Sequence, residues 1–524
     1  MCGVTATPSI SHLWTIETML RKTIGQILPE AAAKFGGKTA LIFKGREISF
    51  TELNALTNQV ANSLVAMGVG PGDRVTLYAP NSWEWVVAYY ATAKLGAVIN
   101  PINVMLTPEE VGFVVQDCGA AALFTTADRA APILGLKRDT DLKEIIIFGD
   151  EKLDGAMSFN EMARAGGDEF AAVAVDAGEL STICYTSGTT GFPKGAMLSH
   201  RNVVVGSAIT AAMNMRTEHD VEMSSLPLAH VYGGVLLNLC FLFGITYVLL
   251  EKFDAAESLT TIKQHGVTIM DGVPTMYFYM LADPEFDSYD LSSLTRCVVG
   301  GQTMPAAKSE EWTTRAGCEI FELWGMTELA GPGIMQHCYG ENRVGSVGLE
   351  MLYLRAKIVD PEDASKEMPV GEVGELMVSG PLVMLGYYGN EAATREAIEP
   401  DGWMHSGDLA KMDEDRYFYI VDRKKDMILT AGFNIYPAEI ERVIAGHPAV
   451  AMVGVGRKPD EAKGEIAKGY VVLKPGAKAS PNDITDYCRE HLAAYKVPRE
   501  VQIVDDLPTT STGKILRREL HTLE

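Results

Sequence analysis

Apolar positions in the first third of the chain follow two alternating periods. Leu53, Val60 and Leu64 belong to an apolar stripe that recurs every three or four positions, which predicts a helix ending at Gly68. Strand and helix then alternate to about residue 340, an order that favours βαβ units and a mainly parallel sheet. The other elements expected in this region are the strands Thr39–Phe43, Glu47–Phe50, Arg74–Tyr78 and Ala97–Asn100, and the helix Trp83–Leu95.

The pattern changes in the last third of the chain. Gly374–Gly380, Arg416–Asp422 and Lys468–Leu473 are strand-like and are separated by turns. The charge changes as well, because residues 1–420 carry a net charge of −24 and residues 421–524 a net charge of +1. Both observations predict a domain boundary near residue 421.

The composition of the chain excludes several classes of function. The net charge of −23 argues against a general nucleic-acid binder, which needs a basic surface. The eight cysteines form no CxxC pair, so they indicate reduced, mostly buried thiols and no zinc knuckle. The N-terminus has no secretory signal, and the apolar stretch Val235–Leu250 is shorter than the roughly 20 residues of a membrane span. We therefore expect a soluble, cytoplasmic protein without integral membrane association.

The strongest chemical signal is a loop rich in glycine and hydroxyl residues that follows an apolar strand. Glycines let the backbone approach an anion closely, hydroxyls donate hydrogen bonds, and Lys194 adds positive charge. The loop suits a triphosphate, but it is not a Walker A loop, because Gly195 follows Lys194 and the glycine spacing differs. Its candidate phosphate contacts are Thr186, Ser187, Gly188, Thr189, Thr190, Gly191 and Lys194.

This loop resembles the phosphate loop of the adenylate-forming superfamily, which includes acyl-CoA synthetases, aryl-CoA ligases, luciferases and adenylation domains of peptide synthetases. Five further segments resemble that family's motifs in the family's order. They are Trp324–Glu328, His405–Asp408, Asp422–Asp426, Gly432–Glu439 and Pro508–Lys514. The resemblance implies an α/β fold with a large N-terminal body of βαβ-built sheets at residues 1–420, a hinge at 421–425 and a small mobile α+β lid at 426–524.

The resemblance also implies how ATP binds. Thr327 would contact the α-phosphate, and Glu328 would hold Mg²⁺. Asp408 would accept hydrogen bonds from both ribose hydroxyls, with Arg423 nearby. Trp324 replaces the family's usual Tyr, so packing on adenine is kept and a phenolic hydrogen bond is lost. Gly301, Gln302 and Gly325 complete the expected nucleotide contacts, and whether Gln302 contacts adenine or the acid is left open.

For the acid, the resemblance places His230 beside the carboxylate being activated. Lys514 would bridge that carboxylate and the α-phosphate. The expected pocket residues are small or apolar and include no Arg or Lys, which disfavours dicarboxylic acids. They are Ala229, His230, Gly233, Gly301, Leu323, Leu329, Ala330, Gly331, Pro332, Gly333 and Ile334. Lys425 matches the hinge position, and Gly432 and Phe433 would line the tunnel for the pantetheine arm of CoA.

The expected reaction converts acid, ATP and CoA into acyl-CoA, AMP and pyrophosphate through an acyl-adenylate, with Mg²⁺ as cofactor. The run Leu329–Gly333 is similar to that of hydroxycinnamate CoA ligases, so we expect an aromatic acid such as ferulate or coumarate. Medium- or long-chain fatty acids and the loading of a carrier protein stay as alternatives. A non-catalytic nucleotide sensor is disfavoured, because Glu328 and Lys514 are both present. The sequence leaves a homodimer open.

Overall fold

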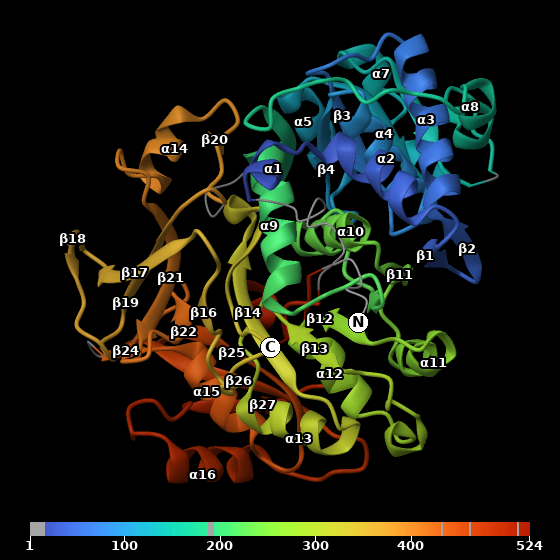
Figure 1. Ribbon diagram of the computed structural model, residues 1–524. Coiled ribbons are helices and arrows are strands. Elements are labelled where there is room, and N and C mark those ends of the chain that lie inside the picture. The colour runs from blue at the N-terminus through green and yellow to red at the C-terminus, as the bar shows by residue number, and fades with distance from the viewer. Residues whose placement is uncertain are drawn as a thin grey trace, which may run out of the picture.

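Four β-sheets organise the part of the chain described by the computed structural model, which comprises residues 16–149, 151–186, 193–430, 433–460, 463–510 and 513–523. Three sheets belong to the body, and the fourth lies in the C-terminal lid, coloured orange to red in Figure 1. The architecture is therefore mixed α/β with a separate small C-terminal domain, as the sequence predicts.

The first body sheet has eight strands and carries the ends of the glycine-rich loop. Its central strands are parallel, whereas β9 runs antiparallel to β8 and to β20. The strands in spatial order are β20 (Gly386–Tyr387), β9 (Lys194–Ser199), β8 (Leu180–Thr186), β4 (Val98–Pro101), β3 (Arg74–Tyr78), β5 (Ala120–Thr125), β6 (Glu144–Ile147) and β7 (Met157–Ser158).

The second body sheet has nine strands and carries the Trp324–Glu328 motif at the end of β14. Its central strands are parallel, and both edges are antiparallel. The strands in spatial order are β16 (Leu349–Glu350), β15 (Gly331–Met335), β14 (Ile320–Met326), β13 (Arg296–Val299), β12 (Ile269–Gly272), β10 (Val221–Ser224), β11 (Thr246–Leu249), β1 (Thr39–Phe43) and β2 (Arg46–Ser49).

Helices α9 and α10 lie at the centre of the body, between the two large sheets (Figure 1). Helix α9 contacts strands of both sheets, and α10 packs on α9, α2 and strands of the second sheet. The helices of the body are α1 (Ile16–Arg21), α2 (Ile24–Phe35), α3 (Phe50–Ala66), α4 (Trp83–Lys94), α5 (Pro108–Cys118), α6 (Ala127–Ala130), α7 (Leu136–Asp139), α8 (Phe159–Ala165), α9 (His200–Met213), α10 (Val231–Phe243), α11 (Ala255–His265), α12 (Pro274–Leu281), α13 (Ala306–Ala316) and α14 (Glu391–Ala397), with short 3₁₀ turns η1 (Ala131–Ile133), η2 (Phe286–Ser288) and η3 (Thr327–Leu329).

The third body sheet is fully antiparallel and carries Asp408 on β21. Its strands in spatial order are β18 (Asp363–Glu367), β17 (Arg355–Asp360), β19 (Gly374–Ser379), β21 (Met404–Met412) and β22 (Phe418–Arg423). The lid sheet follows after a short connection. It consists of β24 (Phe433–Ile435), β23 (Ile428–Thr430), β26 (Gly464–Leu473), β25 (Val450–Asp460) and β27 (Glu500–Ile503), with α15 (Pro437–Ala445), α16 (Pro481–His491) and η4 (Arg517–Leu523).

Most predicted elements are present, but several boundaries are shifted. β26 starts at Gly464 instead of Lys468, and β4 spans Val98–Pro101 instead of Ala97–Asn100. Two further shifts have local reasons. Phe50 begins α3 instead of ending a strand, because the Ser49 side chain caps the helix by accepting the Glu52 N–H at 3.2 Å. The strand predicted from Arg416 starts at Phe418, because Arg416 has a φ of +67° in a turn whose N–H groups bond to Asp413. The predicted βαβ unit is confirmed, since β3 and β4 pair in parallel around α4.

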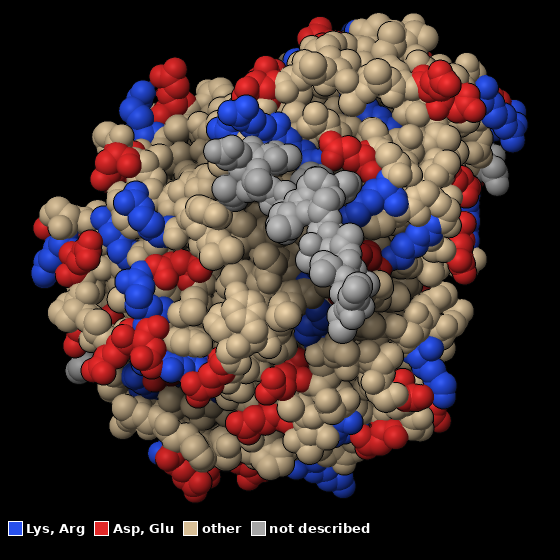
Figure 2. Space-filling view, in the orientation of Figure 1, with Lys and Arg blue, Asp and Glu red and all other residues tan. Residues whose placement is uncertain are grey.

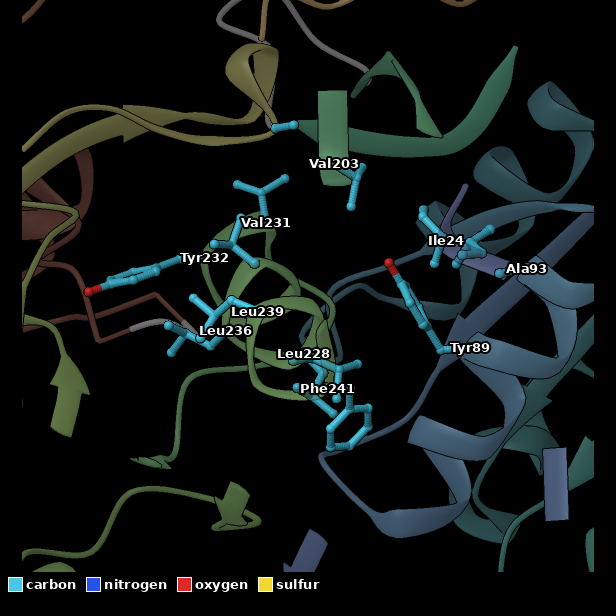
Figure 3. Close-up of a cluster of buried hydrophobic side chains, with 14 of the residues drawn as sticks. Ile24, Tyr89, Ala93, Val203, Leu228, Val231, Tyr232, Leu236, Leu239 and Phe241 are labelled. Atoms are coloured by element: carbon cyan, nitrogen blue, oxygen red, sulfur yellow. The ribbon is translucent and has the colours of Figure 1, made fainter. Parts of the chain in front are cut away.

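The stretch Val235–Leu250 is buried core, as expected. It contains most of α10 and then β11, separated by Gly244 in the left-handed conformation at φ +74°. Figure 3 shows the apolar side chains that surround α10. None of the helices in the described part of the chain combines the length and apolar character that crossing a membrane requires. On the face drawn in Figure 2, acidic and basic side chains are interspersed.

Candidate active site

The glycine-rich loop joins two paired strands. Thr186 ends β8, Lys194 begins β9, and the two residues are direct partners across the antiparallel pair. The Thr186 hydroxyl donates to the Lys194 carbonyl oxygen at 3.4 Å. The hairpin therefore fixes both ends of the loop. Five of the predicted phosphate contacts lie outside the described residues, namely Ser187, Gly188, Thr189, Thr190 and Gly191.

A buried carboxylate lies near the end of this hairpin. Glu328 is only 9% exposed and sits in η3 with Thr327, directly after β14. Its Oε1 accepts a hydrogen bond from the Tyr387 hydroxyl at 2.8 Å, and the Lys194 Nζ lies 5.4 Å from the centre of the Tyr387 ring. Burial, followed by the Glu328 charge, raises the pKa of Tyr387, so its hydroxyl stays a donor. Sequence reasoning missed Tyr387, which comes from the short strand β20.

Glu328 fits a divalent cation delivered with a nucleotide. No Lys, Arg or His of the described residues lies within ion-pair distance of it, so none of these side chains neutralises its negative charge. Groups of three or more His, Cys, Asp or Glu side chains suited to a metal are also absent from the described residues. Mg²⁺ commonly binds through one or two carboxylates together with substrate phosphates, and a single buried carboxylate beside a phosphate loop meets that requirement.

Asp408, on β21, is the second buried carboxylate of the site and is 7% exposed. The indole N–H of Trp324 donates to its Oδ2 at 2.7 Å, and Arg423 Nε lies 3.4 Å from its Oδ1. Burial raises the pKa of Asp408, while Arg423 and the Trp324 hydrogen bond oppose the rise. The sequence analysis credited Trp324 with an aromatic face alone. The structure adds an N–H that orients Asp408.

The lid reaches the body through the loop that carries Lys514. The Thr275 hydroxyl donates to the Gly513 carbonyl at 2.7 Å, and the Ile515 N–H donates to Gln302 Oε1 at 3.2 Å. The acceptor oxygen of Gln302 therefore contacts the lid, an option that the sequence analysis did not consider. A Cβ at Gly301 would lie 2.7 Å from Lys514 Cε and 3.4 Å from its Nζ, and the φ of +91° at this position favours glycine.

Lys514 lies close enough to His230 to affect the pKa of its ring. Burial first, then the Arg423 charge, lowers the pKa of Lys514 to about 8, against the opposing effect of Asp408. Burial, together with Lys514, lowers the pKa of His230 to about 3, so its ring is neutral. The ring caps α10, with Nδ1 accepting the Tyr232 N–H at 3.2 Å. The ring proton must then be on Nε2, which makes that nitrogen a donor.

A cavity opens beside His230. It has an empty volume of about 340 Å³, part of it open to solvent. Ala229, His230 and Ala330 of the predicted acyl pocket line it, together with residues that the sequence analysis did not anticipate. These are Tyr89, Pro101, Thr182, Cys184, Leu198, Val203, Leu228, Val231, Gly234, Val235 and Asn238. They come from six elements, α4, β4, β8, β9, α9 and α10, and from the segment before α10, so no local motif in the sequence indicates them.

The other predicted pocket residues pack against neighbours instead of lining this cavity. A Cβ at Gly233 would meet the Pro227 carbonyl oxygen at 2.3 Å, and one at Gly331 would meet Val235 at 2.5 Å. Leu323 lies against Gly300, and Leu329 against Gly333. Ile334 is fully buried in the core, and Pro332 pairs with Gly325 across the β14–β15 strand pair.

The connection between body and lid contains the predicted hinge residue. Lys425 lies between the end of β22 at Arg423 and the start of β23 at Ile428. Burial lowers the pKa of Lys425, and its carbonyl accepts a hydrogen bond from Arg457. Gly432, predicted for the CoA tunnel, lies outside the described residues, and Phe433 is described only as the first residue of β24.

An ionic cluster that the sequence analysis missed ties the lid to the last body strand. Arg517 follows Lys514 by three residues, and its Nη1 and Nη2 lie 2.6 Å from Asp422 Oδ1 and Glu441 Oε2. Asp422 Oδ2 also accepts the Ala438 N–H, at the start of α15, at 2.8 Å. Asp422 therefore joins β22 to two elements of the lid.

Comparison with known proteins agrees with this geometry. The chain matches the family described as AMP-binding enzyme over residues 28–388 and the AMP-binding enzyme C-terminal domain over residues 439–514. It is 36% identical to a feruloyl-CoA synthase of Amycolatopsis sp, with 92% of this chain and 95% of that protein covered. It is 33% identical to a long-chain-fatty-acid–CoA ligase of Bacillus subtilis (strain 168), with 95% and 94% covered.

Among solved structures, the anthranilate CoA ligase AuaEII in complex with anthranoyl-AMP superimposes with a TM-score of 0.91 at 30% identity, covering 96% of this chain and 97% of that one. Both segments of the family match lie in the order and at the positions of the body and the lid. The chain therefore belongs to the AMP-binding enzyme family, as an acyl-CoA synthetase that works through an acyl-adenylate.

Proposed function

We propose that the acid activated by this acyl-CoA synthetase is an aromatic monocarboxylic acid of the hydroxycinnamate class, such as ferulate or coumarate. The cavity beside His230 carries the proposal, because its lining is apolar apart from a few neutral polar groups. A second carboxylate would be buried there without a cationic partner, which is costly. A feruloyl-CoA synthase and an anthranilate CoA ligase are among the proteins that the chain resembles.

In the first half-reaction, an oxygen of the carboxylate forms a bond to the α-phosphorus of ATP, and the bond to pyrophosphate breaks. Lys514 places positive charge where the two anions meet, beside Gly301. Asp408 accepts hydrogen bonds from the ribose hydroxyls, and Thr327 contacts the α-phosphate. Glu328 would hold Mg²⁺, which when bound would offset the negative charge of the phosphate oxygens. The Nε2–H of His230 hydrogen-bonds to the acid and orients it.

In the second half-reaction, the sulfur of CoA forms a bond to the acyl carbon, and the bond to AMP breaks. Lys514 has no role in this step. Between the two half-reactions the lid rotates about Lys425, and this rotation moves Lys514 out of the site. Gly432 and Phe433 then line the passage for pantetheine. The ion pairs of Arg517 with Asp422 and Glu441 lie beside this hinge and hold the lid in the orientation in which Lys514 reaches the site.

Medium- or long-chain fatty acids form the second candidate class. The observation in their favour is the lining of the cavity, which includes apolar side chains such as Leu198, Val203 and Val235. The long-chain-fatty-acid–CoA ligase relative supports the same reading. The two classes differ in what they place at the end of the cavity: an aromatic ring with oxygen substituents, or a methyl group.

A substrate panel tests the proposal. Pyrophosphate release would be measured with ATP and CoA for cinnamates, benzoates and fatty acids from six to sixteen carbons. We expect the highest kcat/KM for a hydroxycinnamate. A higher value for a fatty acid would overturn the proposed acid class and leave the acyl-CoA synthetase activity in place. Omission of CoA provides a control, because acyl-adenylate formation then stops after one turnover.

A further inference from the structure

Helix α10 separates two environments beside the candidate acid site. Tyr232 and Leu236 lie on one side of it, and Tyr89 of α4 lies on the other (Figure 3). On the Tyr232 side the phenol already has an acceptor, because the Tyr232 hydroxyl donates to Asp271 Oδ1 at 2.8 Å. Asp271 Oδ2 in turn accepts from Arg216 at 2.7 Å, and all three side chains are buried. The Tyr89 side contains the cavity.

Tyr89 presents a hydroxyl to this cavity in a fixed orientation. Asn238 Nδ2 donates to the Tyr89 oxygen at 2.8 Å and to the Gly234 carbonyl at 2.8 Å, while Asn238 Oδ1 accepts from the Tyr90 hydroxyl at 3.1 Å. The Asn238 amide is thus held on both sides, and its orientation is set. In Figure 3 the Tyr89 hydroxyl points away from α4 toward Val203, which also lines the cavity.

The hydrogen of the Tyr89 hydroxyl has no acceptor among the described residues. Its oxygen already accepts from Asn238. Burial raises the pKa of Tyr89, so the phenol stays protonated. Cys184 nearby is a neutral thiol, because burial raises its pKa to about 12. A phenol with a free donor in a mostly apolar cavity favours a ligand that brings an acceptor.

We propose that Tyr89 is a specificity-determining residue, whose hydroxyl donates a hydrogen bond to an uncharged oxygen at the end of the acid remote from its carboxylate. This inference rests on the proposal that the acid enters the cavity beside His230. The oxygen belongs to a hydroxyl, ether or carbonyl group and not to a carboxylate, since no Lys or Arg is among the described residues that line the cavity. An acid that ends in a methyl group leaves the Tyr89 donor buried without a partner.

The test compares Tyr89→Phe with the wild-type enzyme on two matched acids. One is the best acid of the panel that carries a distal oxygen, and the other is the same acid without that oxygen, for example 4-coumarate and cinnamate. In the wild-type enzyme we expect kcat/KM to be at least about tenfold higher for the oxygenated acid. In Tyr89→Phe this preference should fall to within about twofold, because only the oxygenated acid loses a hydrogen bond.

Tyr90→Phe is the matched control. It removes a hydroxyl from the same Asn238 amide, but Tyr90 does not line the cavity. We expect it to keep the wild-type preference, and thermal unfolding of both variants monitors the fold. An equal loss for both acids in Tyr89→Phe, or a wild-type preference for the acid without the oxygen, would overturn the inference. If aliphatic acids prove best, the proposed acid class is wrong. The role of Tyr89 is then tested by the same comparison of wild type and Tyr89→Phe on a keto fatty acid and its parent acid.

Discussion

The site contains two buried carboxylates whose surroundings differ. Asp408, at the ribose end, receives the Trp324 N–H on one oxygen and lies beside Arg423 with the other. Glu328, at the phosphate end, receives one neutral donor from Tyr387 and has no cationic neighbour among the described residues. The two groups are similarly buried, so burial alone does not distinguish them.

The difference teaches what each carboxylate is prepared for. A carboxylate that already has a cation and a donor is held in one orientation and suits weak, directional partners such as hydroxyls. A carboxylate without a cationic neighbour keeps an uncompensated negative charge, and it therefore suits a metal ion. Asp408 is therefore held in its orientation before the nucleotide binds, whereas Glu328 gains its cationic partner only when the nucleotide brings a metal ion.

The largest effect on activity is expected for Lys514, the lid residue that we place between the Asp408 end and the Glu328 end of the site. Lys514→Ala should lower the rate of acyl-adenylate formation by about 10²–10³, since one preorganised charge contact is lost. Supplied acyl-adenylate should still react with CoA.

Lys425→Pro should show the opposite pattern, because proline fixes φ near −65° at the hinge. Both half-reactions would be assayed on both variants, and loss of the same half-reaction in each would exclude a two-orientation lid.

Glu328→Gln comes next, with a loss of about 10²-fold in adenylation. The amide keeps the size of the side chain but removes the charge that a cation needs. Excess Mg²⁺ should recover part of the activity, and a Mg²⁺ titration of pyrophosphate exchange measures this. A normal rate at low Mg²⁺ would show that Glu328 is not the metal ligand and would remove the contrast with Asp408.

These two residues also show how much could be predicted from the sequence. The sequence singles out Lys514 and Glu328 because both lie in short motifs that resemble the family's, and their roles stay predictions. The fold was predictable for a related reason, because periods of two and about 3.6 are local properties, as in β3, α4 and β4. The exact ends of β2 and β22 depended on a cap and a turn instead.

The contacts between distant segments could not be predicted in this way. Tyr387 reaches Glu328 from 59 positions away in the sequence, and Trp324 reaches Asp408 from 84 positions away. The cavity is formed where α4, β8, α9 and α10 meet, so no spacing in the sequence encodes it. Such juxtapositions follow from the packing of whole elements.

The third effect is a dependence on pH. The pKa of Lys514 is lowered to about 8, so its charge is present below that pH and is lost above it. For adenylation, kcat/KM should fall about tenfold for each pH unit well above 8, because this ratio reports the free enzyme. Conversion of supplied acyl-adenylate should not show the same decline. A flat profile up to pH 9.5 would contradict the assigned role of the charge.

Trp324→Phe should have a smaller effect, about tenfold in the KM for ATP. The variant keeps an aromatic face but removes the N–H that bonds to Asp408. With 2′,3′-dideoxy-ATP, which has no ribose hydroxyls, the variant and the wild-type enzyme should differ by less than about twofold. An equal loss with both nucleotides would mean that Trp324 acts through ring packing and not through Asp408.

The smallest effect is expected for Tyr387→Phe, the matching change at the phosphate end. It removes the hydroxyl that donates to Glu328 at 2.8 Å, just as Trp324→Phe removes the donor to Asp408. Asp408 depends on its protein partners for orientation, but Glu328 receives most of its compensation from the incoming cation. The apparent affinity for Mg²⁺ should therefore fall by less than about fivefold, since a neutral hydrogen bond contributes about 1 kcal/mol or less. Mg²⁺ titration of pyrophosphate exchange measures the change, with Tyr388→Phe as a neighbouring control. A loss as large as that of Glu328→Gln would mean that Tyr387 itself contacts the phosphates, and that the phosphate end is as fully organised in advance as the ribose end.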